Sequence, residues 1–449
     1  MEGQTQATMQ AQSMDRMPIT HWSHTKRIAF RFCCVYFSLY VLVTQMLTTL
    51  ILIPWLDWPE LGSLPPFLPM TSWVAKHLFR QQAALVVTGS GSGDKTFDWV
   101  EAFCFLVLAL VATAIWLVVD RRRKNYVTAH KWLRVFVRFA LGSTMFAYGF
   151  DKAIPLQMPF PNLARLIEPF GNFSPMGVLW SSIGAAPGYE IFGGVAEIVG
   201  GALVLIPRTT SLGALVCLAD MLQVFLLNMT YDVPVKLFSF HLIVLALFLL
   251  APEATRLANF FLRDQAVAPS TQPALFSTRR ANRVALIVQI AFAAYLVAAN
   301  VYGATQGWKK YGGGAPKSEL YGIWDVDEFV MDGQTHPPLL MDASRWRRIV
   351  FQLPDSATFQ RMDETLVRYK VPFRAKDKLV FIDPSKDLNL QRDDLRDLFN
   401  FQRPAKDRLV LDGSMDNHKI HMQLHLVDRD KFLLVNRGFH WIQEYPFNR

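Results

Sequence analysis

The chain has 449 residues, of which 51% are hydrophobic, 13% aromatic and only 18% charged. This composition is too apolar for an ordinary soluble enzyme. The net charge is +9, from 46 basic and 37 acidic residues, but no soluble module carries a basic face, so the charge does not predict nucleic-acid binding.

The chain begins with a polar segment. Residues 1–27 are rich in Gln, Met, Ser and Thr, which predicts a disordered cytoplasmic N-terminus. The segment contains no short apolar core followed by a small-residue cleavage site. We therefore expect no cleavable signal peptide, and a first span that serves as its own anchor.

Apolar runs of membrane length predict seven transmembrane helices within residues 28–303. They lie at about 28–56, 98–119, 132–154, 189–206, 210–229, 234–251 and 282–302. The runs at 189–206 and 234–251 are the shortest, roughly 17 or 18 residues, which is the lower limit for crossing a bilayer. A count of six spans with one re-entrant segment stays open.

Basic residues cluster in alternate connections between these runs. They are Lys26, Arg27, Arg121, Arg122, Arg123, Lys124, Lys131, Arg208, Arg256, Arg263, Arg279, Arg280 and Arg283. Short basic loops stay cytoplasmic. The pattern therefore predicts a multi-pass protein of the bacterial inner membrane, with a cytoplasmic N-terminus and an extracytoplasmic region after Val301.

Three connecting or packing features are distinctive. In the loop at 57–97 we expect a surface helix at 70–87, followed by a flexible Gly-Ser link from Gly89 to Gly93. The loop at 155–188 is too apolar for solvent and is expected to cover the outer end of the bundle. Small residues between Gly193 and Ala202 recur at three- and four-residue spacing, which predicts close helix packing.

After the seventh span the sequence pattern changes. Gly312–Gly314 mark a linker at 304–317, and residues 318–449 switch to a period of two. Alternating segments are found at Trp346–Leu353, Lys378–Ile382, Arg408–Leu411, His418–Val427 and Lys431–Val435. Separated by turn sequences, they predict an antiparallel β-barrel domain that is closed or nearly closed.

Charged or titratable residues recur through the apolar runs. Depth along the helices places Arg138, Glu197, Asp220 and His241 in a middle layer. Nearer the outer end lie Asp151, Lys152, Gln157, Glu190, Asp232 and Lys236. Such groups are costly in hydrocarbon, so we expect these ten to converge on a ligand-binding pocket open to the outer face.

Structural readings of the same residues stay open. Buried ion pairs also fix helix register, Lys152 and Asp232 lie near enough to the interface to snorkel, and His241 is as well explained as a satisfied buried histidine as by proton transfer. The spans contain no metal-ligand spacing. The four cysteines, Cys33, Cys34, Cys104 and Cys217, lie in apolar runs without a CxxC pair, which favours structural burial.

Two motifs carry a family resemblance. The sequence from Arg138 to Gly142, followed by Tyr148 to Lys152, resembles the first conserved helix of the DoxX-like membrane proteins, and Glu197 to Thr209 resembles their second helix and basic turn. The resemblance covers about residues 132–252. It implies a four-helix core able to hold a quinone or another small lipophilic molecule. In the C-terminal region, Gly322-Ile323-Trp324 is similar to the opening of lipocalin-like barrels.

Three functions follow from these patterns. The first is a quinone-binding redox or redox-accessory subunit with membrane or periplasmic partner subunits. The second is a non-enzymatic carrier that passes a lipid or hydrophobic metabolite between bundle and barrel. The third is a distant relative of the vitamin-K-dependent carboxylase bundle, in which Lys152 or Lys236 acts as a base.

Overall fold

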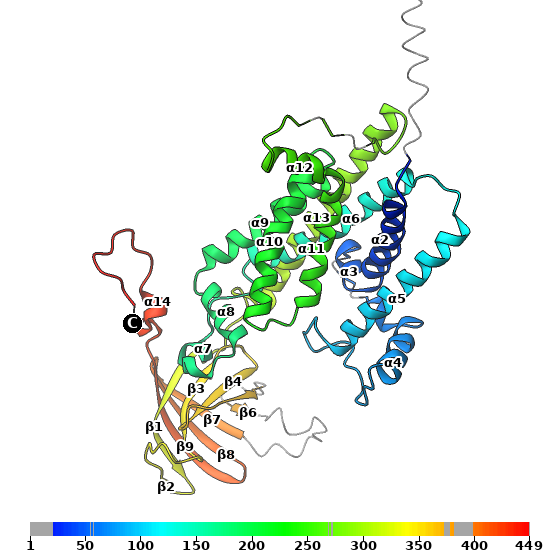
Figure 1. Ribbon diagram of the computed structural model, residues 1–449. Helices are drawn as coiled ribbons and strands as arrows, with labels where there is room; N and C mark the ends of the chain where they lie inside the picture. The colour runs from blue at the N-terminus through cyan, green and yellow to red at the C-terminus, as the bar shows by residue number, and fades with distance from the viewer. Residues whose placement is uncertain are drawn as a thin grey trace, which may run out of the picture. The chain divides into compact units, whose positions relative to one another are not determined.

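The computed structural model describes residues 21–448, with gaps at 54, 57, 268, 271–272, 372–377 and 381–397. These residues form two compact units. The helical unit contains the chain up to Phe150 and Gly194–Gly303, and the sheet unit contains Asp151–Gly193 and the chain from Ala304 onward. Figure 1 labels the helices and strands of both.

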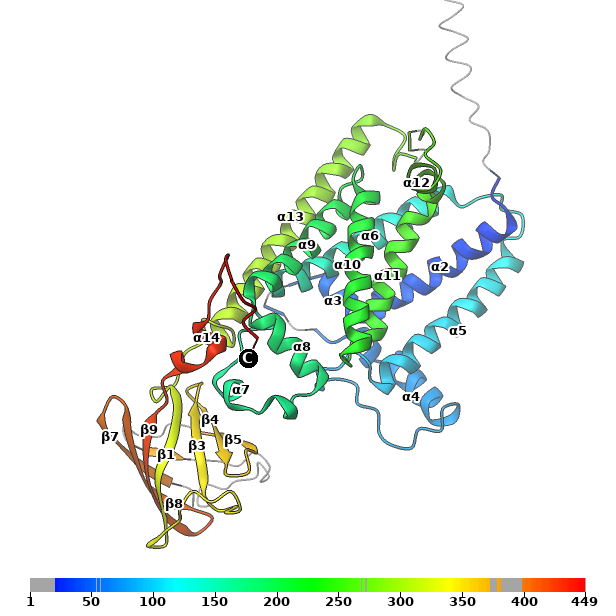
Figure 2. The ribbon, with the colours of Figure 1, turned by 60° about the vertical axis from the view of Figure 1, so that its left-hand side comes forward.

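The helical unit is built from long helices joined by short turns and one long loop. They are α2 (His24–Val43), α3 (Met46–Leu50), α4 (Phe67–His77), α5 (Thr96–Val119), α6 (Val127–Ala153), α9 (Pro187–Leu205), α10 (Thr210–Thr230), α11 (Lys236–Leu250), α12 (Ala254–Phe261) and α13 (Arg279–Lys310), with short 3₁₀ turns at Leu61–Ser63 and Ala251–Glu253. Helices α2 and α5 run side by side, as do α10 and α11 (Figure 2).

Among the described residues, five helices are long and apolar enough to cross a membrane. They are Thr96–Val119, Pro187–Leu205, Thr210–Thr230, Lys236–Phe261 and Arg279–Lys310. The helical prediction is thereby confirmed at this coarser level, and the chain carries the helices of a membrane protein. Helices α2 and α6 are also long, but their basic and polar residues lower their hydropathy.

Glycines let α6, α9 and α10 approach closely. A Cβ added at Gly213 would lie 2.3 Å from the backbone nitrogen of Val204, and one added at Gly201 would lie 3.0 Å from the carbonyl oxygen of Gly142. No other residue fits against a neighbouring backbone at such distances. The close packing that the small residues of the fourth span predict is therefore present.

The first predicted span differs from expectation at both ends. The helix begins at His24, inside the segment expected to be disordered, because Ser23 accepts a hydrogen bond from the Lys26 N–H (3.2 Å) and Trp22 packs against Tyr126. Residues 1–20 lie outside the described part of the chain. The span is also broken after Val43, where Thr44 is extended and its hydroxyl donates to the Tyr40 carbonyl (2.6 Å).

The sheet unit contains a single antiparallel sheet. Its strands are β1 (Gly322–Met331), β2 (Gln334–Thr335), β3 (Trp346–Phe351), β4 (Ser356–Arg361), β5 (Leu366–Lys370), β6 (Lys378–Val380), β7 (Leu398–Ala405), β8 (Arg408–Met415) and β9 (His418–Leu426). Their order is β5-β4-β3-β1-β9-β8-β7-β6, with β2 beside β1. Alternate residues such as Ile420, Met422 and Leu424 point into one core.

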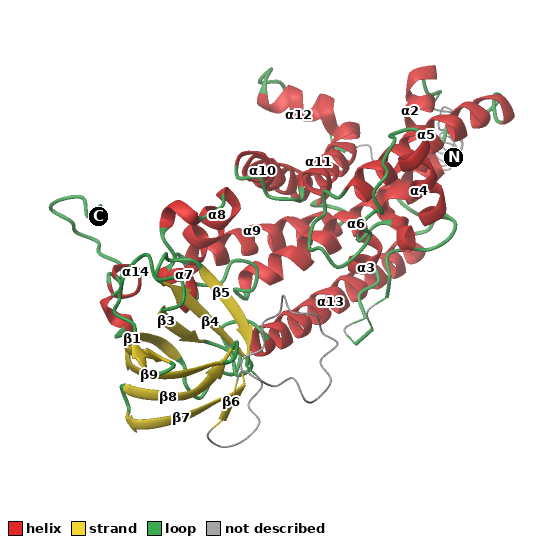
Figure 3. Cartoon of the chain, turned by 90° about the horizontal axis from the view of Figure 1, so that it is seen from below, coloured by secondary structure: helices red, strands yellow, loops and turns green. Residues whose placement is uncertain are grey.

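The sheet curls into a half-barrel (Figure 3). Its two outer strands, β5 and β6, are consecutive in the chain, and the path from Lys370 to Lys378 spans at most about 29 Å. A flat sheet in this order would separate them by about 34 Å. The connection therefore forces the curl. The predicted closed barrel is not formed by the described residues, because β5 and β6 are the ends of the hydrogen-bonded order.

Two further expectations for this unit are wrong. The segment Lys431–Val435 is not a strand: Asp428 caps a 3₁₀ turn at Arg429–Lys431, and α14 (Leu433–Asn436) follows. The linker expected at 304–317 is partly helical, because α13 continues to Lys310 and the chain then folds back, with the Gly314 N–H donating to the Trp308 carbonyl (3.1 Å).

The segment between α6 and α9 packs on the sheet. It contains α7 (Leu163–Ile167), a 3₁₀ turn at Phe170–Asn172 and α8 (Pro175–Gly184). The Leu163 N–H donates to Gln352 (3.1 Å), and the Gln360 amide donates to the Ile167 carbonyl (3.2 Å). Leu163 also forms an apolar cluster with Ile323 and Val350. This segment is thus a covering element, as its apolar composition predicts, and among the described contacts it covers the sheet.

Candidate functional site

A polar cavity of about 300 Å³ lies at one end of the helical unit. At this end α2 and α6 finish, while α5 and α11 begin. Its walls contain Tyr40, Thr44, Gln45, Glu60, Val87, Thr88, Gly89, Ser90, Gly91, Ser92, Gly93, Lys95, Asp98, Glu101, Ala102, Tyr148, Val235, Leu237 and Phe238. The break in the first span explains part of this polarity, because it brings Thr44 and Gln45 to the wall.

Glu101 is the most unusual group in the cavity wall. Its side chain is 3% exposed, and its Oε1 has no hydrogen-bond partner among the described residues. The carboxyl group lies against Gly62, where an added Cβ would be 2.0 Å from Oε1. A buried carboxyl group without a partner is costly, so this position calls for a ligand or a proton.

Two more carboxyl groups lie near Glu101. Asp98 accepts hydrogen bonds from the Lys95 backbone (2.8 Å) and from the Lys95 ammonium (2.9 Å). Glu60 lies in the preceding loop, where burial raises its pKa, nearby Asp98 raises it further, and Lys95 lowers it. Three carboxyl groups therefore face one ammonium, which itself also binds the Ser92 carbonyl (2.8 Å). The wall holds more acceptors than donors.

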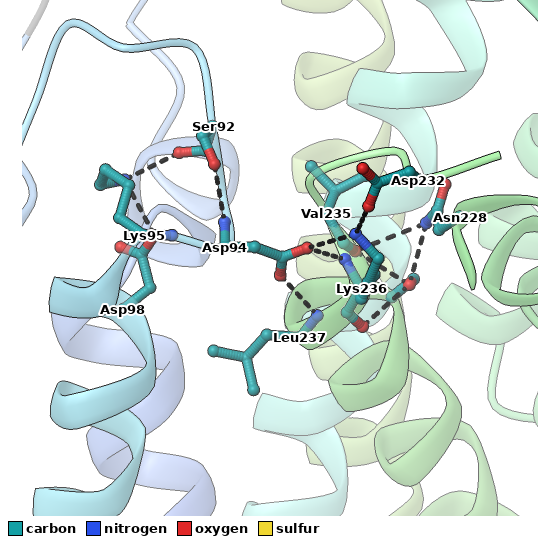
Figure 4. A network of polar contacts seen from close by, with 10 residues as sticks. Ser92, Asp94, Lys95, Asp98, Asn228, Asp232, Val235, Lys236 and Leu237 are labelled. Atoms are coloured by element: carbon teal, nitrogen blue, oxygen red, sulfur yellow. Dashed lines mark hydrogen bonds and ion pairs between the residues drawn. The ribbon is translucent and has the colours of Figure 1, made fainter. Parts of the chain in front are cut away.

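The Gly-Ser loop that closes one side of the cavity is fixed to α11 by Asp94 (Figure 4). The Asp94 carboxylate accepts hydrogen bonds from the backbone N–H groups of Lys236 (2.8 Å) and Leu237 (2.9 Å). Gly93 adds a backbone hydrogen bond to the Pro234 carbonyl (2.8 Å). The first N–H groups of a helix lack partners within it. Asp94 thus acts as the N-cap of a helix far along the chain, and we call this contact the Asp94 latch.

His241 lies behind the cavity wall in a stack of rings. Its imidazole lies 3.7 Å from the Tyr40 ring at an angle of 7°. Its Nδ1 lies 2.7 Å from the Leu237 carbonyl, and its Nε2 lies 2.7 Å from the Tyr36 hydroxyl. Since a carbonyl only accepts, Nδ1 carries the proton and Nε2 accepts from Tyr36. His241 is therefore a satisfied buried histidine that supports Tyr40, a wall residue.

The other predicted residues of the helical unit lie outside the cavity wall. Arg138 donates to the carbonyls of Val204 (2.9 Å) and Leu205, and so caps the C-terminal end of α9. Lys236 pairs with Asp232 (2.9 Å), whose side chain is 85% exposed, and lies 3.8 Å from the Asp94 carboxylate. Glu197 is buried, and Asp220 lies on α10 close to Cys217.

The remaining four predicted residues belong to the sheet unit. They are Asp151, Lys152, Gln157 and Glu190. Glu190 is 2% exposed, and its Oε1 accepts a hydrogen bond from the Met158 N–H (2.8 Å). The Gln157 N–H donates to the Asp151 carbonyl (3.1 Å). The ten residues are thus divided between the two units, and none of them is in the cavity wall.

The sequence reading missed the residues that form the wall. The signal was present at the start of the second span, where Asp94, Lys95, Asp98 and Glu101 follow one another at helical spacing. Glu101 lies inside a candidate membrane helix of mean hydropathy 2.8. A carboxyl group in such a run marks a functional position. The charged residues between Val135 and His241 are more numerous, and they drew the prediction to the wrong helices for the cavity.

Histidines in the sheet unit pair with aspartates on the strands. His418 lies 2.7 Å from Asp332, and His425 lies 2.6 Å from Asp327. His421 lies 2.5 Å from Asp412. In the described part of the chain, no group of three or more metal-ligating residues is arranged to hold a metal ion. These pairs therefore act as surface contacts between strands.

Comparison with known proteins gives one informative match. The chain is 30% identical over 127 residues to the "Uncharacterized protein YwoB" of Bacillus subtilis (strain 168). The match covers 28% of this chain and 80% of the relative. No family model matches the chain, and no solved structure matches it either.

Proposed function

The chain belongs to the same family as YwoB of Bacillus subtilis, and we propose that its helical unit is a membrane bundle that binds a quinone or another small lipophilic molecule in the polar cavity. In this role it serves as a redox or redox-accessory subunit with membrane or periplasmic partners. The observation that carries the proposal is Glu101, a buried carboxyl group with an unpartnered oxygen in the wall of a cavity that a quinone ring fits.

The cavity wall offers the groups that such a ligand needs. Tyr148 and Gln45 can donate hydrogen bonds to ring oxygens, while Leu237 and Phe238 provide an apolar side. A bound quinone would supply a two-electron, two-proton couple. Glu101 is positioned to accept or return a proton, since Glu60 and Asp98 beside it disfavour a second and third negative charge. The excess of acceptors favours the hydroxyl groups of the reduced form.

The proposed membrane topology follows the basic connections. We propose seven spans, with α2 and α6 added to the five apolar helices, in the DoxX-like arrangement of the bacterial inner membrane. Arg121–Lys124 follow the last turn of α5, whereas the cavity lies at its first turns. With basic connections on the cytoplasmic side, the cavity opens toward the outer face and the sheet unit is extracytoplasmic.

Ligand binding is tested on the full chain extracted gently with its lipids. Native mass spectrometry should show a bound small molecule, and decylubiquinone and its quinol should bind in a titration. Glu101→Gln should weaken binding by about tenfold or more, because a hydrogen bond to a charged group contributes roughly 1.5–3 kcal/mol. Thr113→Val, also buried on α5 but outside the wall, is the matched control. Protein that carries no small molecule and binds neither redox form would refute the proposal.

The two other candidate functions find less support. A carrier needs space inside the sheet, but Trp324, Phe329, Phe359 and Phe399 fill its described core, each 1% exposed or less. A lysine base needs a desolvated amine without a carboxylate partner, whereas Lys236 pairs with Asp232. Lys152 also has an interaction of its own. Neither observation favours the carrier or the carboxylase-like base.

A further inference from the structure

The C-terminal tail, Arg437–Asn448, exposes large apolar side chains. Phe439 is 76% exposed, Trp441 90%, Ile442 81% and Tyr445 85%. These exposures are far above those of the sheet, where large apolar residues lie in the core. Exposed apolar residues that stand singly are normal, but several in one short segment mark an interaction surface.

The tail is folded on itself in a way that leaves these side chains outward. The Arg437 guanidinium lies 4.7 Å from the Phe447 ring and donates to Gln443 (3.2 Å). The rings of Phe439 and Trp441 meet edge to face, 5.0 Å apart. The cation is thus fixed at the base of a loop, while the aromatic groups occupy its outer side.

The tail begins close to chain segments that lead into apolar helices. Phe432, five residues before Arg437, packs on the cluster formed by Leu163 and Ile323. Leu163 belongs to the segment that continues directly into α9, and the sheet itself follows α13. Both helices are candidate membrane spans. The connections therefore keep the tail within a short chain length of a bilayer surface.

We propose that Arg437–Asn448 is an interfacial membrane anchor that inserts its aromatic side chains among phospholipid headgroups. Trp and Tyr concentrate at membrane–water interfaces, where the ring is apolar and one edge is polar. Arg437 complements the lipid phosphates, and a loop with Trp441 and Ile442 at its outer side provides the apolar insertion. The anchor restrains the sheet unit at the surface, in addition to its covalent connections.

The test places a reporter on the tail of the full chain in nanodiscs. Trp441→Cys is labelled with an environment-sensitive fluorophore, in a background whose four native cysteines are replaced and whose helicity is verified. Lys406→Cys, exposed in the β7–β8 turn, is the matched control. We expect a blue-shifted spectrum at 441 and quenching by headgroup-labelled lipid at least about threefold stronger than at 406, as interfacial insertion requires.

A second measurement keeps the label out of the experiment. Trypsin cleavage after Arg437 should be slower in nanodiscs than in detergent, and Trp441→Ser combined with Ile442→Ser should restore the faster cleavage. Equal lipid quenching at 441 and 406 would overturn the proposal. A protected label at 441 that lipid does not quench would also overturn it, because a protein partner or a second copy of the chain would then cover the tail.

Discussion

Replacement of Asp94 by alanine should release the Gly-Ser loop from α11. The Asp94 side chain is 10% exposed and accepts two backbone hydrogen bonds, at 2.8 and 2.9 Å. Loss of an N-cap costs about 0.5–2 kcal/mol, and bonds to a charged acceptor are at the upper end. We therefore expect a local cost of about 2 kcal/mol, with little from the 3.8 Å ion pair to Lys236.

The assay is hydrogen exchange of the peptide that contains the start of α11. A local cost of about 2 kcal/mol corresponds to roughly 30-fold faster exchange of the Lys236 and Leu237 amides, if local opening governs it. Asp94→Asn keeps one acceptor oxygen and should give an intermediate rate. In contrast, Asp232→Asn removes only an exposed partner of Lys236 and should change exchange by less than about twofold.

The latch also forms part of the cavity wall, so its release should reach the ligand. Asp94→Ala should weaken quinol binding, because the loop from Val87 to Gly93 would no longer hold its place. Exchange at the start of α11 that is unchanged by Asp94→Ala, or accelerated equally by Asp232→Asn, would refute the reasoning. In either case the carboxylate would not be the group that caps the helix.

Three further predictions concern packing, capping and pH. Gly213→Ala should lower the melting temperature in detergent and the yield of monodisperse protein, because its Cβ would meet the Val204 backbone at 2.3 Å, whereas Gly193→Ala, with open space, should be neutral. Arg138→Ala should cost about 2–4 kcal/mol in unfolding experiments, since it leaves two buried carbonyls without a donor. Hydrogen bonds from Ser344 lower the pKa of Asp342 to about 2, with His336 adding to the effect. Because the folded pKa lies below the unfolded value, this stabilisation is complete above about pH 4 and is lost as the pH falls through 2; Ser344→Ala should move the loss to higher pH in a circular dichroism titration, and an unmoved midpoint would contradict it.

What the sequence determined by itself is the type of each element. A bilayer requires that backbone polar groups bond within a segment, so long apolar runs become helices whatever their partners. The runs that correspond to α5, α9, α10, α11 and α13 were therefore readable, and so was the period of two in β3, β8 and β9. These properties are local, and tertiary packing does not alter them.

Only the tertiary structure decided which polar groups meet. Asp94 and Lys236 are far apart in the chain, and depth along a helix says nothing about the direction in which a side chain points. Arg138 bonds to backbone carbonyls of α9, although its depth matched that of several acidic residues. Glu101 reaches the cavity because the first span breaks at Thr44 and Gly62 leaves room for its carboxyl group. Side-chain direction and close contact depend on the order and rotation of helices, which hydropathy does not encode.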